Sequence, residues 1–229
     1  MVSPSLRHRQ GGVRIEVGRS RMAILRAAWA ASGLLAGLLI GLMPIGAGDV
    51  ARADTAAAGL VLNLRGSAEA TRETVQRPLS PEDSVFTGDA VATGAKSRIE
   101  IRLGRDTTIA IGENGRVKID DFLAEAGGEI SLEAGALMLD KDPESVARPI
   151  KVNSDFGQIA VRGTNFFAGP SRGSFGVLLL RGHVVVTAAG TSVELKAGEG
   201  TDIAYPGAPP SPPKVWAPER VEEALAQLR

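Results

Sequence analysis

The 229-residue sequence contains no cysteine, only two histidines and 4% aromatic residues. Without cysteine the chain cannot form a disulfide framework, so an exported form must be held together by its hydrophobic core. If an N-terminal leader is removed, His183 is the only histidine left. A lone histidine cannot build the usual zinc site, which needs several His or Cys ligands.

Catalytic patterns are also absent from the sequence. Asp120-Asp121 and Asp140-Lys141-Asp142 lack the spacing of a calcium loop, in which ligands alternate around an obligatory glycine. Ser67, Ser131 and Ser154 lack the flanking glycines of a nucleophile elbow, and neither a phosphate-binding loop nor a dinucleotide fingerprint occurs. We therefore expect no catalytic residue, no cofactor and no metal site, and we argue against an enzyme.

The first 53 residues are typical of a secretory signal peptide. Several arginines precede an uncharged stretch at residues 27–48, and Ala51-Arg52-Ala53 is a small-x-small cleavage signature. We expect a periplasmic mature chain that begins at Asp54, with translation starting at Met1 or at Met22. The alternative is an inner-membrane anchor formed by residues 27–48, since 22 uncharged residues can just span a bilayer.

Beyond the leader the charge is mildly negative. Residues 54–229 carry 19 basic and 24 acidic side chains, a net charge of −5. A chain with this net charge has no excess of positive charge that would attract nucleic acid or anionic lipid. We therefore expect no nucleic-acid partner, and no membrane contact once the leader has been cleaved.

Hydrophobic residues between 54 and 204 recur with a period of two, which is typical of strands with one buried face. The pattern is clearest in residues 98–103, 107–111, 116–119 and 129–132, and glycine-bearing turns separate these runs. It predicts an all-β domain over residues 54–204. Within residues 98–103, the three aliphatic side chains should face the core while Glu100 and Arg102 face solvent.

Two later segments depart from this alternation. Residues 175–180 are mostly apolar, which predicts a strand covered on both faces, and Arg181-Gly182 then suggests a tight hairpin turn. Residues 205–217 are rich in proline and predict an extended linker. Residues 218–229 predict a short amphipathic helix, which must dock on something because an isolated helix of this length is marginal.

Several short motifs follow one another along the β region: Gly88-Asp89, Thr93-Gly94, Arg162-Gly163-Thr164, Gly182 and Gly198. Together with the alternating strands between them, they resemble the FecR domain, a periplasmic module of bacterial signalling proteins, over about Gly59 to Ile203. The alternation alone does not separate a sandwich, a barrel and a solenoid. The resemblance implies a stacked β arrangement, a β-solenoid or β-roll, ahead of the short C-terminal helix predicted from residues 218–229.

Each motif has a structural and a functional interpretation, and we favour the structural one. Gly163 permits a backbone with positive φ, and Asp89 should accept backbone N–H bonds in a turn. The functional interpretation is that Arg162, beside a sharp bend, presents its guanidinium to an acidic partner.

Full-length members of the family that this chain resembles combine a cytoplasmic anti-sigma segment, one transmembrane helix, the FecR domain and a C-terminal sensor of an outer-membrane transporter. The few residues ahead of the hydrophobic run and the lack of a sensor pattern after Pro206 lead us to expect a stand-alone domain. We expect a non-catalytic binding or scaffolding module in envelope signalling, whose partner is another envelope protein of unknown identity.

Two alternatives remain open at this point. One is a membrane-anchored FecR-type sigma-factor regulator. The other is a structural protein of the cell envelope that binds glycan, for which Phe86, Phe122 and Tyr205 would be the side chains available to stack on sugar rings.

Overall fold

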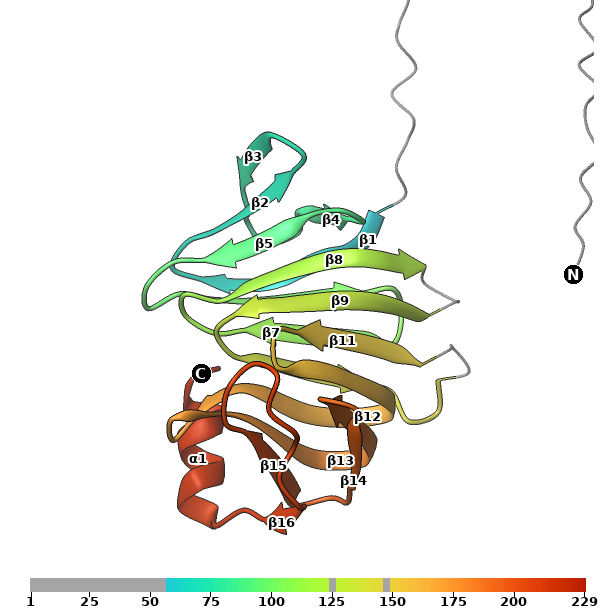
Figure 1. Ribbon diagram of the computed structural model, residues 1–229. Coiled ribbons are helices and arrows are strands. Elements are labelled where there is room, and N and C mark those ends of the chain that lie inside the picture. The colour runs from blue at the N-terminus through green and yellow to red at the C-terminus, as the bar shows by residue number, and fades with distance from the viewer. Residues whose placement is uncertain (1–56, 124–126, 146–148) are drawn as a thin grey trace, which may run out of the picture. The chain divides into compact units, whose positions relative to one another are not determined.

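A computed structural model describes residues 57–123, 127–145 and 149–229 of the chain (Figure 1). The predicted signal peptide, its cleavage site and Met22 lie outside these residues. Within the three described ranges, no helix has the length and hydrophobicity needed to cross a membrane.

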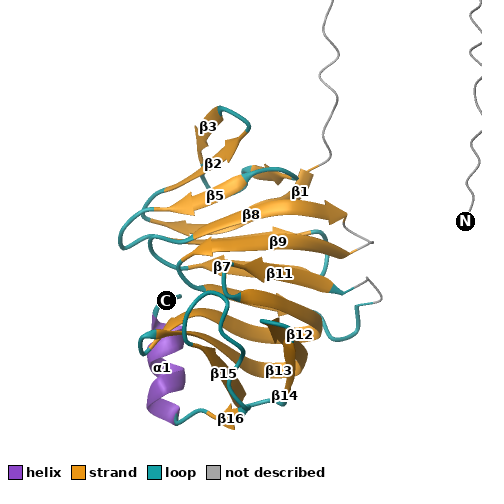
Figure 2. Cartoon of the chain, in the orientation of Figure 1, coloured by secondary structure: helices purple, strands orange, loops and turns teal. Residues whose placement is uncertain are grey.

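Strands dominate the described chain, and the one helix there lies near the C-terminus (Figure 2). The elements are β1 (Ala57–Arg65), β2 (Ala68–Arg72), β3 (Val75–Pro78), β4 (Ser84–Phe86), β5 (Ala90–Thr93), β6 (Arg98–Leu103), β7 (Thr107–Ile111), β8 (Arg116–Leu123), β9 (Gly127–Ala134), β10 (Leu137–Lys141), β11 (Ile150–Ser154), β12 (Gly157–Ser171), β13 (Ser174–Ala188), β14 (Thr191–Leu195), β15 (Glu199–Ile203), β16 (Lys214–Val215) and α1 (Pro218–Ala226). The predicted all-β character of the fold is confirmed, and β6 and β7 have the predicted bounds.

The strands form one hydrogen-bonded sheet that curls over on itself. We call β3-β2-β5-β8-β9-β11 the first limb and β10-β7-β6-β1-β4 the second limb; β12 joins them. In Figure 1 the first limb lies in front of the second. Among the described strands, β9 and β11 are the one parallel pair and all other pairs are antiparallel. The β-solenoid part of the prediction is therefore not confirmed.

The long strand β12 belongs to both limbs. Its first part, Gly157–Val161, pairs with β11, and its later part, Asn165–Ala168, pairs with β10 on the second limb. β13 follows β12 along almost its whole length, so the two strands make a ribbon that passes from one limb to the other. Strands that change sheets in this way do so through bulges or bends.

The predicted hairpin at Arg181-Gly182 is wrong. β13 runs through both residues, and the reversal between β12 and β13 instead lies at Arg172 and Gly173, both of which have positive φ. Gly182 also has positive φ, +92°, but opposite it the register with β12 shifts. Gly163 and Thr164 of β12 oppose this single glycine, a bulge that bends the ribbon without ending β13.

The main hydrophobic core is formed by the side chains that alternate inward along both limbs. Ile99, Ile101 and Leu103 are fully buried, as the period of two predicted, while Arg102 is exposed and Glu100 is half-buried. The burial of these three side chains confirms the predicted orientation of β6.

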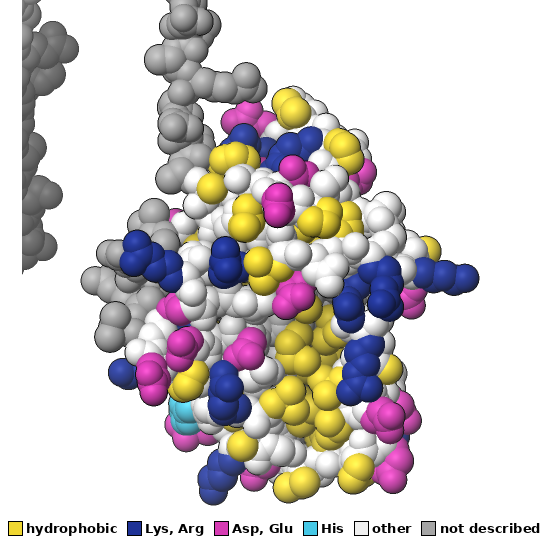
Figure 3. Space-filling model, turned by 180° about the vertical axis from the view of Figure 1, so that it is seen from behind, with side chains coloured by type: hydrophobic (Ala, Val, Ile, Leu, Met, Phe, Trp, Pro, Cys, Tyr) yellow, Lys and Arg dark blue, Asp and Glu magenta, His cyan; other side chains and the backbone are white. Residues whose placement is uncertain are grey.

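A second, smaller cluster lies beneath α1. Leu178 faces it, whereas its neighbours Val177 and Leu179 face the main core, so this part of β13 is covered on both faces as predicted. α1 has the predicted amphipathic character and contributes Ala224 to the cluster, and Leu228 follows just beyond its end. Five members of the cluster are only partly buried: Ala110, Met138, Leu180, Val221 and Leu225. Figure 3 shows hydrophobic side chains gathered on the rear face of the molecule, beside basic ones.

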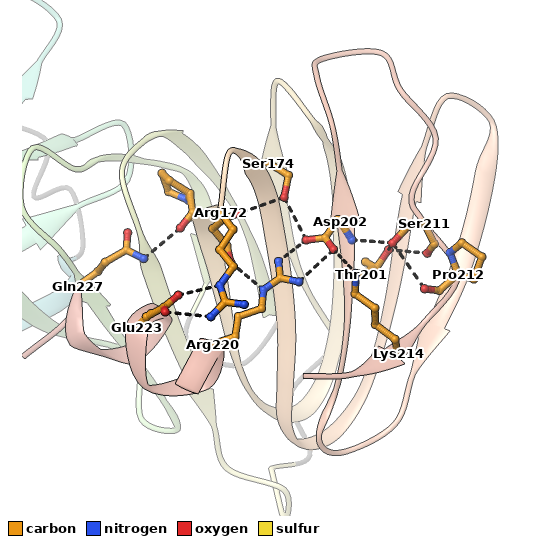
Figure 4. Close-up of polar contacts among 12 residues, drawn as sticks. Arg172, Ser174, Thr201, Asp202, Ser211, Pro212, Lys214, Arg220, Glu223 and Gln227 are labelled. Atoms are coloured by element: carbon orange, nitrogen blue, oxygen red, sulfur yellow. Dashed lines mark hydrogen bonds and ion pairs between the residues drawn. The ribbon is translucent and has the colours of Figure 1, made fainter. Parts of the chain in front are cut away.

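The proline-rich segment 205–217 lies against the sheet. Its β16 pairs with β15, and Trp216 is only 4% exposed. The guanidinium of Arg220 stacks on the Trp216 ring at 3.6 Å. It also pairs with Asp202 of β15 (Figure 4). The helix predicted to need a docking surface therefore packs on its own domain.

Candidate functional site

The motif Arg162-Gly163-Thr164 lies where the β12–β13 ribbon passes between the limbs, a place we call the corner. The register between the two strands shifts here, next to Asn165, and Gly163 has φ of +59°. Gly182 lies opposite on β13, so the corner brings together four of the nine motif residues. The corner thus consists of facing glycines in positive-φ conformations.

The backbone at the corner is too closely packed for side chains at either glycine. A Cβ atom added to Gly182 would lie 2.3 Å from the carbonyl oxygen of Gly163, and one added to Gly163 would lie 3.0 Å from the Cα atom of Pro143. Distances below about 3 Å from Cβ to backbone require the chain to move. The shape of the corner therefore accounts for both glycines.

A buried lysine lies close to the corner. Lys141 ends β10, is 1% exposed, and donates a 2.8 Å hydrogen bond from Nζ to Asp106. Burial alone would raise the pKa of Asp106, but hydrogen bonds from Lys141, Ser145 and Thr107 outweigh it, so the pKa lies below its usual value. A buried charge is tolerated only when paired in this way. The pair is therefore a structural tie between β10 and the turn before β7.

The surface of the corner is charged. A hollow of about 380 Å³ is lined by Arg105, Asp106, Thr107, Thr108, Asp140, Asp142, Pro143 and Arg181. Arg181 pairs with Asp140 at 2.7 Å. Arg162 lies opposite His183 across the ribbon, and both side chains are exposed. No ion pair of Arg162 is found in the described part of the chain. Its guanidinium can therefore contact another molecule.

The hydroxyl of Thr164 is buried at the corner, as is the side-chain oxygen of the neighbouring Asn165. Thr164 is fully buried, and its Oγ1 atom has no hydrogen-bond partner within the described structure. An unsatisfied buried hydroxyl costs free energy.

Asp89 forms a second buried site, remote in sequence from the corner. It is fully buried and accepts hydrogen bonds from the backbone N–H of Phe86 at 3.0 Å and from Arg77 at 2.5 Å. Its backbone and that of Gly88 bond to Ile119 of β8. The predicted backbone N–H bond is present, and Arg77 of β3 is the partner that sequence analysis missed.

The other motif residues lie in turns at separate places. Thr93 at the end of β5 bonds through its hydroxyl to the carbonyl of Gly112 at 2.6 Å, and Gly94 donates its N–H to Ser67. Gly198, with φ of +86°, lies in the turn before β15 and donates its N–H to Leu179. The nine predicted positions therefore occupy four different parts of the domain.

The aromatic residues considered for glycan stacking are mostly inaccessible. Phe122 is only 4% exposed, and Phe86 lies beneath the guanidinium groups of Arg72 and Arg77. Tyr205 alone of the three is well exposed, at 65%. The expectation that all three rings can stack on sugars was therefore wrong for Phe122.

The structure also contains an apolar pocket, of about 290 Å³, that the sequence did not suggest. It lies where the end of β9, the β11–β12 turn, the β12–β13 turn and the end of β15 meet, and we call it the mouth pocket. Its lining residues are Leu132, Glu133, Ala134, Gly135, Asp155, Phe156, Pro170, Gly173, Ser174, Phe175 and Ala204. The rings of Phe156 and Phe175 stack there with centroids 4.6 Å apart. Because four distant segments form it, no local sequence signal could have revealed it.

Comparison with known proteins confirms the family resemblance. Residues 89–185 match the model of the family described as FecR protein. The match runs from Asp89 through β13 as far as Val185, so it includes the corner and excludes Gly88 and Gly198. No curated protein matches the chain.

Solved structures share the fold. Two crystal structures of a candidate anti-sigma factor from Parabacteroides distasonis each match with a TM-score of 0.50 and 12% identity. Each match covers 58% of this chain and 62% of that chain, so this chain spans less than two thirds of the protein it resembles. At this level of identity the likeness concerns the fold alone.

Proposed function

Given the FecR match over residues 89–185, we propose that this protein is a non-catalytic binding module of bacterial envelope signalling. It acts in the periplasm as a scaffold for another envelope protein. The family match is the observation that carries the proposal, and the anti-sigma description of the protein with a similar fold supports the signalling context.

The corner is the surface that we assign to the partner. It lies inside the matched region, and its main chain is closely packed around Gly163 and Gly182. Rigid presentation lowers the ordering cost of binding. The exposed guanidinium of Arg162 then fits an acidic group on the partner, because arginine forms bidentate pairs with carboxylates.

Photo-crosslinking in cells tests this assignment. A photoreactive residue at position 162 should join the protein to one envelope protein, whereas the same residue at position 151 on β11, also exposed, should not. Arg162→Ala should weaken recovery of that partner by pull-down without lowering the stability of the domain. Equal crosslinking from both positions, or none from either, would refute the corner as the partner surface.

Localisation distinguishes the module from its membrane-anchored alternative. We propose that the mature chain begins at Asp54 and is released into the periplasm. Intact mass spectrometry of the exported species should give the mass of residues 54–229. Recovery only from membranes, with residues 27–48 still attached, would favour an anchored sigma-factor regulator.

A further inference from the structure

The mouth pocket has the size and lining of a site for a small ligand. Its floor is formed by Leu132 and Phe175, which are 3% and 6% exposed. The volume of about 290 Å³ lies just below the usual range for ligand pockets, roughly 300–1,000 Å³. It therefore suits a body of one aromatic ring better than a larger cofactor.

The polar groups of the pocket are few, and most of them already have partners. The hydroxyl of Ser174 lies 2.9 Å from the carbonyl oxygen of Ser171 and 3.1 Å from Asp202 Oδ1, and it can donate its one proton to either. Glu133 pairs with Arg116 at 2.6 Å. Asp155 is exposed, and no hydrogen bond or ion pair of its side chain is found within the described residues. The carboxylate of Asp155 is thus the ionisable group of the pocket that remains available to bind a ligand.

The charge of the lining has one sign. Both of its ionisable residues, Glu133 and Asp155, are acidic, and no lysine or arginine lines the pocket. An anionic ligand would be repelled there, whereas a cation would be attracted. Apolar walls with one placed charge are how small-molecule sites combine affinity with orientation.

We propose that the mouth pocket binds a small apolar amine, with a single ring or branched hydrocarbon body against the two phenylalanines and an ammonium group at Asp155. The mouth pocket is distinct from the corner, and this proposal does not depend on the function proposed for the corner. Binding there would connect the β11–β12 turn of the first limb with the β12–β13 turn.

Three probes with the same ring test the proposal: 2-phenylethylamine, 2-phenylethanol and 3-phenylpropionate. In calorimetric titrations of residues 54–229, the amine should bind about two- to fivefold more tightly than the alcohol, the range expected for an exposed ion pair. The propionate should bind most weakly. Failure of all three to bind at millimolar concentration would overturn the proposal.

Three variants locate the binding. Asp155→Asn should remove the preference for the amine while leaving the affinity for the alcohol unchanged. Asp121→Asn, which removes an exposed charge outside the pocket, should keep the preference. Ala204→Trp, at an exposed position of the rim, should abolish binding of the amine and the alcohol with the unfolding midpoint unchanged. Binding that survives Ala204→Trp, or a preference that survives Asp155→Asn, would overturn the assignment.

Discussion

The β12–β13 ribbon is irregular in two places, and the structure holds each of them by a different means. At the corner, Gly163 and Gly182 are fixed by backbone atoms, since a Cβ on either would meet main chain. At the turn between the strands, Gly173 also has positive φ, but a Cβ there would meet nothing within 4 Å. The same backbone conformation therefore has different causes at the two places.

The turn is instead held by side chains from α1 and from Gln227 just beyond its end. Arg172 forms two 2.9 Å hydrogen bonds with Glu223, Arg220 bonds to Ser171, and Gln227 donates to the carbonyl of Pro170 (Figure 4). Packing of main chain against main chain tolerates no added atom, whereas side-chain ties can be replaced one by one. The stability of the corner should therefore be sensitive to glycine substitution, and the stability of the turn to loss of the helix contacts.

The largest effect is expected from Gly182→Ala. The substitution combines the penalty for positive φ with a clash at the Gly163 carbonyl, so we expect a loss of about 3 kcal/mol in the free energy of unfolding. Gly173→Ala is the matched control, because it adds the φ penalty alone, about 1 kcal/mol. Urea titration of both variants would measure the difference. Equal losses would show that neighbouring backbone does not distinguish the corner from the turn.

Arg220→Ala tests the ties from α1. The arginine is only 7% exposed, stacks on Trp216, and holds Asp202, so its removal should cost about 2 kcal/mol. Arg172→Ala, which breaks only an exposed pair, should cost much less. Fluorescence of Trp216 during unfolding of residues 54–229, where it is the sole tryptophan, provides the readout. A larger loss from Arg172→Ala would contradict this order.

Gly163→Ala should have an intermediate effect, about 1 to 2 kcal/mol, since its Cβ would lie 3.0 Å from the Cα atom of Pro143, a milder overlap than the one at Gly182. Arg162→Ala, at the neighbouring exposed residue, should change stability by no more than about 0.5 kcal/mol. Thermal or chemical unfolding of the two variants separates backbone strain from loss of a surface charge. A stable Gly163→Ala protein would mean that the corner can relax.

The structural features that could be predicted from the sequence are those that depend on neighbouring residues along the chain. The alternation in β6 predicted the burial of Ile101 because the period of a strand is a local property. The same alternation, Leu137, Leu139, Lys141, also points Lys141 inward, but its partner Asp106 lies 35 residues away and could not be foreseen. The pairing of a buried charge depends on contacts that only the fold creates.

The errors have a similar origin. Arg181-Gly182 was interpreted as a hairpin because a glycine with positive φ serves equally well in a turn and in a bulge. Only the pairing of β12 with both limbs shows whether a turn or a bulge is present. The mouth pocket needs four segments that are remote in sequence, so no motif marks it.

Acid should weaken the ties of α1 before it affects the corner, which depends on uncharged backbone. Burial alone would raise the pKa of Asp202, but the hydrogen bonds from Arg220 and Lys214 outweigh it and lower the pKa to about 2, from 3.8. Because the folded-state pKa is depressed, the stabilisation is complete above the unfolded pKa and is lost as pH falls through the folded one. Solvent reaches part of this site, so we expect a contribution of about 1 kcal/mol or less. The difference in unfolding free energy between the native protein and Asp202→Asn should therefore shrink as the pH falls from about 5 to about 2. A difference that stays constant over this range would show that the charge of Asp202 does not hold the helix.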